Sequence, residues 1–155
     1  MNAELRVARI ERRVSLDTIS DCDWLLTELD GDRVVESMRY EDGDIATYGL
    51  RKVRGWVAED GDRYRSFGES WWFLDMQAVA IVEVVVSDKV IGQFGYCSML
   101  IGGIESDASR DYLDEMSGIL VREVTETLAD LGLTIPDGID TPYVQGDPWL
   151  AEALA

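Results

Sequence analysis

The chemistry open to this chain rests on carboxylates, because the sequence has no histidine and only two lysines. The absence of histidine removes the commonest general base and the usual hydrolase triads, and neither lysine lies in a nucleophile motif. Closely spaced acids, Glu105 with Asp107 and Asp21 with Asp23, are the nearest candidates for glycosidase or magnesium-dependent chemistry. Such pairs arise by composition in a chain with 31 acids. We therefore keep a carboxylate or divalent-metal enzyme as an alternative and expect no enzyme.

Three Asp-Gly-Asp motifs, at 30–32, 42–44 and 60–62, place further carboxylates at close spacing. Asp-Gly suits tight hairpin turns, and the segments 33–40 and 51–58 before the second and third motifs resemble strands. A calcium loop is the rival interpretation, but none of the three motifs continues into the twelve-residue pattern that ends in glutamate. The motifs are predicted to be structural turns.

Cofactor and metal motifs are absent from the sequence. Cys22 and Cys97 lie far apart, without a CxxC motif, and are expected to be buried free thiols. The glycines at 92 and 95 lack the GxGxxG spacing, and no P-loop occurs. No cofactor and no metal are expected.

The clearest predicted element is a helix over 108–131, with Asp107 as its N-cap and Gly132 at its end. Apolar residues recur on one stripe at spacings of three and four: Leu113, Met116, Leu120, Val124, Leu128 and Leu131. Six acids lie in its first turn or off the stripe: Asp111, Asp114, Glu115, Glu123, Glu126 and Asp130. They form either a solvated outer face or a line of carboxylates that imitates phosphates and docks in a basic groove.

A central hairpin is predicted over 71–103. Its first strand, through Val86, carries apolar residues on both faces, and Ser87–Lys89 is short enough to join it to a second strand over 90–101. The predicted fold is α+β, an antiparallel sheet of about five strands with one long C-terminal helix packed on it. Residues 1–155 are expected to form a single domain, with turn-rich strands over 1–70 and a tail over 133–155. Trp149 is expected to pin that tail, through a short helix opened at Pro148.

The net charge is −17, from 31 acidic and 14 basic residues. A surface this negative repels nucleic acid and anionic membranes and favours cations, basic proteins or high salt. The start of the chain lacks an apolar signal core, so a cytoplasmic protein is expected. One basic cluster, Arg6, Arg9, Arg12 and Arg13, is expected to pair with carboxylates of the same chain.

One block resembles a known group of proteins. Gly103-Ile104-Glu105-Ser106-Asp107, followed by Tyr112-Leu113 and the acidic helix, resembles small acidic proteins of phages and prophages of high-GC bacteria. Weaker matches are Leu5-Arg6-Val7, Asp23-Trp24-Leu25 and Trp72-Phe73 with the strand that follows. A Trp commonly precedes the GIESD segment in that group, whereas this chain has Gly102. The group has no assigned activity, so the resemblance implies a fold and a mobile-element origin.

Two hypotheses follow besides the metal enzyme. The first is a non-enzymatic binding protein that occupies a basic, nucleic-acid-binding surface of a host protein, as a DNA-mimic or anti-defence type inhibitor. It would bind neither nucleic acid nor membranes directly. A homodimer is compatible with the composition. The second is an accessory protein whose acidity is adaptation to salt. The small number of lysines fits that adaptation and fits a high-GC coding bias equally.

Overall fold

The computed structural model describes residues 2–145 and has an α+β fold, as predicted. The chain divides into two compact units, Met1–Thr18 with Phe73–Ala155 and Ile19–Trp72. Each unit is described by itself. The expectation of one domain over the whole chain stays a prediction.

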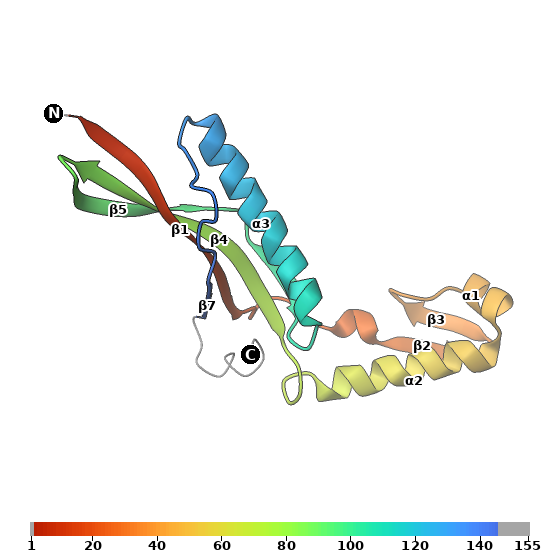
Figure 1. Ribbon diagram of the computed structural model, residues 1–155. Coiled ribbons are helices and arrows are strands. Elements are labelled where there is room, and N and C mark those ends of the chain that lie inside the picture. Colours follow the sequence, from red (N-terminus) through yellow and green to blue (C-terminus); the bar gives the residue numbers. More distant parts are fainter. Residues whose placement is uncertain (1, 146–155) are drawn as a thin grey trace. The chain divides into compact units, whose positions relative to one another are not determined.

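The first unit contains a sheet of five strands, the number predicted. The strands are β1 (Ala3–Leu16), β4 (Phe73–Val86), β5 (Lys89–Cys97), β6 (Ile101–Glu105) and β7 (Tyr143–Gln145). Their order is β5-β4-β1-β7, and β6 also pairs with β4 (Figure 1). The long strand β4 is therefore central, since β1 lies along one edge and β5 and β6 share the other.

The prediction of a wholly antiparallel sheet is wrong, because β7 runs parallel to β1. The N–H groups of Ile10 and Arg12 donate to the carbonyls of Asp140 and Pro142, at 3.0 and 2.8 Å. These bonds hold the segment just before β7 against the outer edge of β1, and the two segments run in the same direction. The sheet is therefore mixed.

Strand β4 and its turn into β5 agree with the prediction, although β5 ends at Cys97 and Ile101 begins the separate strand β6. In β4 the even-numbered residues Met76, Ala78, Ala80 and Val82 are buried on one face, and Val79, Ile81 and Val85 are buried on the other. Ser87 and Asp88 link β4 to β5 as a two-residue turn, in which both residues have positive φ. This is the backbone geometry of the tight hairpins that suit the twist of paired strands.

A register shift in β1 aligns its apolar residues with those of β4. Val7 lies opposite Val82 and Ile10 opposite Ala80, with the shift at Ala8 between them. An extra residue of this kind is a β-bulge, and it lets Val7 and Ile10 share a face although they are three positions apart. Both side chains are buried against the helix.

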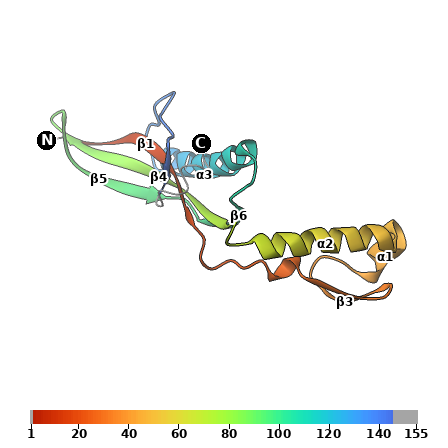
Figure 2. The ribbon, with the colours of Figure 1, turned by 90° about the horizontal axis from the view of Figure 1, so that it is seen from below.

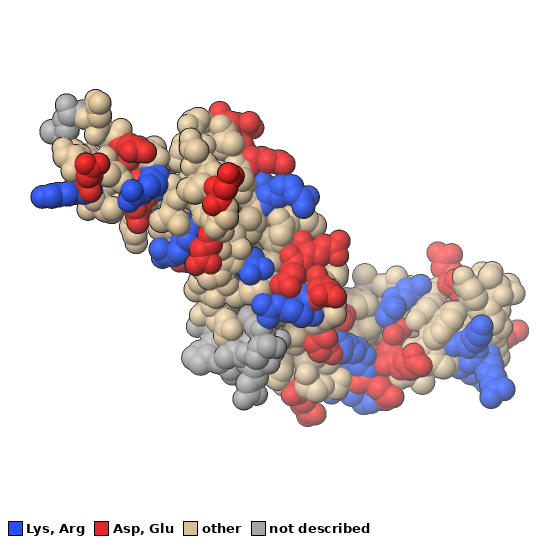
Figure 3. All heavy atoms as spheres, viewed as in Figure 1, with Lys and Arg blue, Asp and Glu red and all other residues tan. Residues whose placement is uncertain are grey.

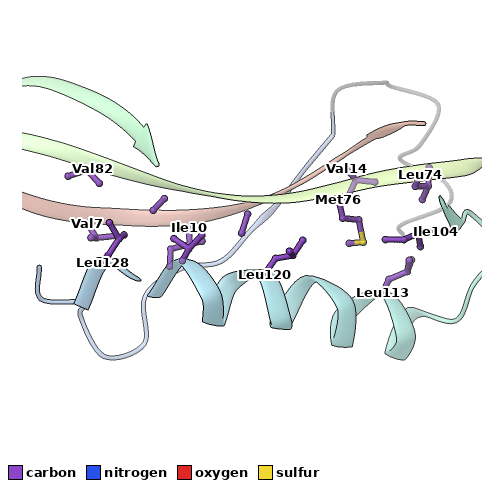
Figure 4. Close-up of a cluster of buried hydrophobic side chains, with 13 residues drawn as sticks. Val7, Ile10, Val14, Leu74, Met76, Val82, Ile104, Leu113, Leu120 and Leu128 are labelled. Atoms are coloured by element: carbon purple, nitrogen blue, oxygen red, sulfur yellow. The ribbon is translucent and has the colours of Figure 1, made fainter. Parts of the chain in front are cut away.

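Three helices occur among the described residues, rather than one, and α3 (Arg110–Asp130) is the helix predicted from the periodicity. It covers one face of the sheet (Figure 2), and Leu113, Leu120 and Leu128 point toward residues of β1, β4 and β6 (Figure 4). The predicted N-cap at Asp107 is wrong, because the Ser109 hydroxyl accepts the bond from the Tyr112 N–H. Leu131 is also not on the buried stripe, since the helix ends before it and it is 65% exposed.

The second unit differs most from the prediction. It contains the short 3-10 helix η1 (Asp23–Leu25), the hairpin β2 (Thr27–Asp30) and β3 (Arg33–Ser37), α1 (Asp42–Tyr48) and α2 (Leu50–Ser66). Helix α2 lies alongside the hairpin (Figure 1, Figure 2). The predicted strand over 51–58 is wrong, because the partly or fully buried residues Leu50, Val53 and Trp56 recur at helical spacing.

The three Asp-Gly-Asp motifs have three different roles. The first is the hairpin turn that was predicted, with Gly31 at a φ of 62° between β2 and β3. The second begins α1, where Glu41 and Asp44 form a capping box. The third lies inside α2, where Asp60 accepts hydrogen bonds from Arg39 and Tyr40. The prediction of a structural turn is therefore confirmed for the first motif and wrong for the other two, which lie in helices.

The buried side chains of the second unit are Cys22, Leu25, Val53 and Trp71. Trp71 is fully buried, with its indole N–H 2.8 Å from the Arg63 carbonyl oxygen. Cys22 is a buried free thiol as predicted. In the first unit, Cys97 is also free but exposed, because it lies on the edge strand β5.

Two further findings concern the ends and the surface of the chain. The predictions for Pro148 and Trp149 fall outside the described residues. Within residues 2–145, no helix is both long enough and apolar enough to cross a membrane.

Candidate protein-binding face on helix α3

Five of the six acids predicted as a partner-binding site lie on the outer side of α3, opposite its buried residues. At 3.6 residues per turn the buried Leu113, Leu120 and Val124 share one side of the helix. The opposite side carries what we call the acidic face: Asp111, Glu115, Glu123, Glu126 and Asp130. All five residues are exposed, and Figure 3 shows acidic side chains along the course of α3.

The acidic face is not neutralised by the chain around it. Within the described part of the chain, no ion pair involves any of its five acids. Arg122 lies among them, and with Ile119, Glu123, Glu126, Thr127 and Asp130 it lines a shallow hollow of about 420 Å³. Ile119 and Tyr112, on the same side, are partly exposed. The face thus combines unpaired carboxylates with apolar contact area.

Asp114, the sixth predicted acid, does not belong to this face. Its carboxylate accepts a hydrogen bond from the Tyr143 hydroxyl at 2.6 Å and one from Arg110 at 3.1 Å, and Arg12 lies 3.5 Å away. The bond from Tyr143, followed by the contacts with Arg110 and Arg12, lowers the pKa of Asp114. Asp114 therefore ties α3 to β1 and β7. No local pattern reveals this, since Tyr143 is distant in the sequence.

The basic cluster near the N-terminus pairs with acids of the same chain, as predicted. Arg9 and Arg13 bind the Glu11 carboxylate at 2.9 Å each, on the face of the sheet away from α3. Arg6 binds Glu83 on the neighbouring strand at 2.8 Å. Arg12 lies on the other face, with its guanidinium 3.7 Å from the centre of the Tyr143 ring. Arg6, Arg9 and Arg13 thus pair with acids of the sheet, whereas Arg12 pairs with Asp114 of α3.

The carboxylate pairs proposed for catalysis lie at the start of η1 and at the end of β6. Asp21 accepts a hydrogen bond from the Asp23 N–H, which shapes the start of η1. Glu105 ends β6 opposite Phe73, whereas Asp107 lies in the turn that follows. Among residues 2–145 no cluster of three or more Cys, Asp and Glu residues is arranged to hold a metal ion.

The structure instead brings together Asp17 and Asp75, a pair that the sequence analysis missed. Asp17 is 7% exposed and accepts the Gly103 N–H at 2.8 Å. Burial, the Asp17 charge and a hydrogen bond with Asp17 raise the pKa of Asp75. A Cβ at Gly102 would lie 2.8 Å from an Asp75 oxygen and 3.0 Å from an Asp17 oxygen. A larger residue at position 102, such as Trp, would collide with the pair.

This acid pair lies at the corner where β1, β4 and β6 meet. A pocket of about 320 Å³ adjoins Asp75 and is lined also by Arg13, Gln77 and Leu100. Asp17 and Asp75 share a hydrogen bond with each other, and Asp17 also holds the backbone of Gly103. Both side chains are thus hydrogen-bonded within the fold.

Comparison with known proteins adds no function. No protein-family model, curated protein or solved structure matches the chain. The acidic face of α3 remains the group of predicted site residues that the fold places together, exposed and unpaired among the described side chains.

Proposed function

We propose that this protein is a non-enzymatic binding protein that docks the acidic face of α3 on a basic, nucleic-acid-binding surface of another protein. The observation that supports this proposal is a set of five outward carboxylates, on one rigid helix, that no cation of the described chain pairs with. The resemblance to small acidic phage and prophage proteins supports a mobile-element origin, and hence a host protein as the partner.

The physical basis is electrostatic attraction along a preformed helix. The buried side of α3 is packed on the sheet, so the helix backbone that carries these acids is fixed before binding and loses little conformational entropy. A net charge of −17 attracts a basic partner over a distance and speeds association at low salt. Tyr112 and Ile119 then supply apolar area of the kind that carries much of the energy at interfaces.

The charge density of the face indicates which kind of basic surface fits. Asp111 and Asp130 are about 28 Å apart along the helix at 1.5 Å per residue. Five acids and Arg122 leave a net charge of four over that length, or about one charge per 7 Å. A single DNA strand carries about one charge per 3.4 Å of helix axis. A moderately basic nucleic-acid-binding groove therefore matches the face better than a highly basic one.

The test is capture of bacterial nucleic-acid-binding proteins on the immobilised protein, washed at low and then moderate salt. We expect one nucleic-acid-binding protein or complex to stay bound and to be displaced by excess DNA. A variant with Glu115→Lys, Glu123→Lys, Glu126→Lys and Asp130→Lys should lose it. The matched control reverses four exposed acids of the second unit: Glu28→Lys, Asp32→Lys, Glu36→Lys and Glu59→Lys.

The control makes the result specific to the acidic face, because both variants change the net charge equally. Retention by the control and loss by the α3 variant would support the proposal. Equal loss by both variants, or capture of only a broad set of basic proteins that salt elutes, would show that the charge acts generically. Either of these results would overturn the proposal.

A further inference from the structure

The edge strand β5 and the segment after it form an uncharged stretch in a highly charged chain. Lys89 is the only charged residue between positions 89 and 104, whereas the chain as a whole has 45 charged residues, 31 acidic and 14 basic. The same segment contains no proline. Natural edge strands are usually blunted by charge or proline, because an exposed edge pairs readily with other strands. Beyond Lys89 at its start, β5 carries neither charge nor proline, and its pairing with β4 has one β-bulge, at Ile91.

The outer edge of β5 is open in the described part of the chain. There β5 pairs only with β4, so the N–H and C=O groups that point away from β4 have no strand partner. Its side chains are also exposed: Ile91 is 66% exposed and Phe94 46% exposed. Met99 and Leu100, which follow the strand, are exposed as well. The edge therefore offers both backbone hydrogen bonds and apolar surface.

From these features we infer that β5 pairs antiparallel with β5 of a second copy, so that two copies share one continuous sheet. A strand edge paired with itself about a two-fold axis is self-complementary, which is the usual geometry of homodimers. Two chains of charge −17 repel each other over most of their surfaces. An uncharged edge is where such copies approach at the least electrostatic cost, whereas a cationic partner would be drawn to the acidic surfaces.

The residues of β5 favour a register centred on Gln93, the middle of the strand. In that register Phe94 lies opposite Gly92 of the second copy, on the face of the sheet that carries α3. A Cβ built at Gly92 meets no atom within 4 Å, so there is room for an aromatic ring to lie over it.

The salt dependence of the dimer follows from the same negative charges. Salt screens the repulsion between the two copies and leaves the uncharged contact itself nearly unaffected, so the dimer should tighten as salt is added. We expect the dissociation constant to fall about tenfold between about 0.05 M and about 0.5 M salt. Binding of a basic partner to the acidic face has the opposite dependence, which keeps the two proposals separable.

The test is sedimentation velocity of the full chain at concentrations up to about 200 µM, at low and high salt. We expect a dimer whose fraction rises with concentration and with salt. Ile91→Lys with Phe94→Lys should give a monomer, because it places four lysines at the paired edges. The matched control, Tyr112→Lys with Ile119→Lys, adds the same charge at exposed apolar positions of α3 and should stay dimeric. Circular dichroism verifies that each variant is folded.

A second measurement needs no variant. Hydrogen exchange of the unaltered protein should show slower exchange of the amides between residues 90 and 96 as the concentration rises. A monomer at about 200 µM in about 0.5 M salt would overturn the inference. So would a dimer that survives Ile91→Lys with Phe94→Lys, or exchange in β5 that does not change with concentration.

Discussion

Glu11 shows how single residues balance charge within this acidic chain. Its side chain is 9% exposed and lies between Arg9 and Arg13 on β1. Burial raises the pKa of Glu11, but hydrogen bonds and charges from Arg13 and Arg9 outweigh that effect, and the pKa is lowered. Because the lowered pKa belongs to the folded state, Glu11 adds stability above the ordinary pKa of Glu, and that stability is lost as pH falls through the lowered value.

Replacing Glu11 with Gln should therefore destabilise the protein at pH 7. Two arginines would lose a nearly buried charged acceptor, and we expect a loss of about 1–3 kcal/mol in the free energy of unfolding. Urea unfolding at pH 7 and at pH 3 is the measurement, with the loss shrinking at pH 3. Glu83→Gln, which removes the more exposed partner of Arg6, is the control and should cost less. Equal losses would show that burial of Glu11 has no effect.

The pKa of Asp75 is shifted in the opposite direction to that of Glu11. Burial and the nearby Asp17 raise the pKa of Asp75, so the folded state holds this proton more tightly than the unfolded chain does. Stability from this group is present below the ordinary pKa of Asp and is lost as pH rises through the raised value. Above that raised pKa, the ionised Asp75 beside Asp17 therefore opposes folding.

Asp75→Asn should raise the free energy of unfolding at pH 7 by up to about 1 kcal/mol, because it keeps a hydrogen-bond donor toward Asp17 and removes the like charge. The gain should disappear near pH 3, where Asp75 is protonated. Urea unfolding at both pH values measures it. Asp137→Asn, at an exposed position, is the matched control. A loss of stability at pH 7 would contradict the charge assignment.

At the scale of elements, the hairpin of β4 and β5 depends on an unfavourable turn. Ser87 and Asp88 have φ values of 50° and 64°, in the left-handed region. Glycine, and to a lesser degree asparagine and aspartate, enter this region readily, whereas for a residue such as Ser87 the cost is about 1 kcal/mol. The sheet pairing on both sides of the turn must offset that cost.

Ser87→Asn with Asp88→Gly should stabilise the protein by about 1 kcal/mol, because Asn-Gly is the preferred pair for such a turn. The melting temperature should rise, and circular dichroism measures it. Gly31→Ala gives the reverse test in the other hairpin, where φ is 62° and no atom lies within 4 Å of an added Cβ. That variant should lose stability through backbone strain alone. An unchanged melting temperature in both variants would be evidence against the strain.

At the scale of the whole molecule, negative charge is in excess after pairing. The ion pairs among the described residues engage arginines, including Arg6, Arg33 and Arg39, and the many remaining acids repel one another. Such repulsion destabilises the compact state and is screened by salt. Stability should therefore depend on ionic strength.

Thermal unfolding at low and high salt measures this dependence and tests the salt-adaptation hypothesis. We expect a cooperative transition already at about 0.01 M salt, with a melting temperature a few degrees higher at about 0.5 M. A protein folded at low salt does not require halophilic screening. Absence of folded structure at low salt would favour salt adaptation over the proposed binding function.

The sequence by itself was sufficient for features that depend on local pattern. The 3.6-residue spacing of Leu113, Leu120 and Val124 identified α3, and the apolar run before Ser87 identified β4 and its hairpin. The acidity of the outer side of α3 follows from the same periodicity. These predictions succeeded because the signal lies within one or two turns of helix or a few residues of strand.

Only the tertiary structure decided which acids form hydrogen bonds or ion pairs with other side chains. Asp60 lies in a helix rather than a turn, where it pairs with Arg39; Asp114 binds Tyr143 far along the chain; and Asp17 meets Asp75 across two strands. Strand β7 likewise joins the sheet through Ile10 and Arg12. In each case the partner is distant in sequence, and the hydrogen bonds form only once the sheet and α3 bring the residues within reach.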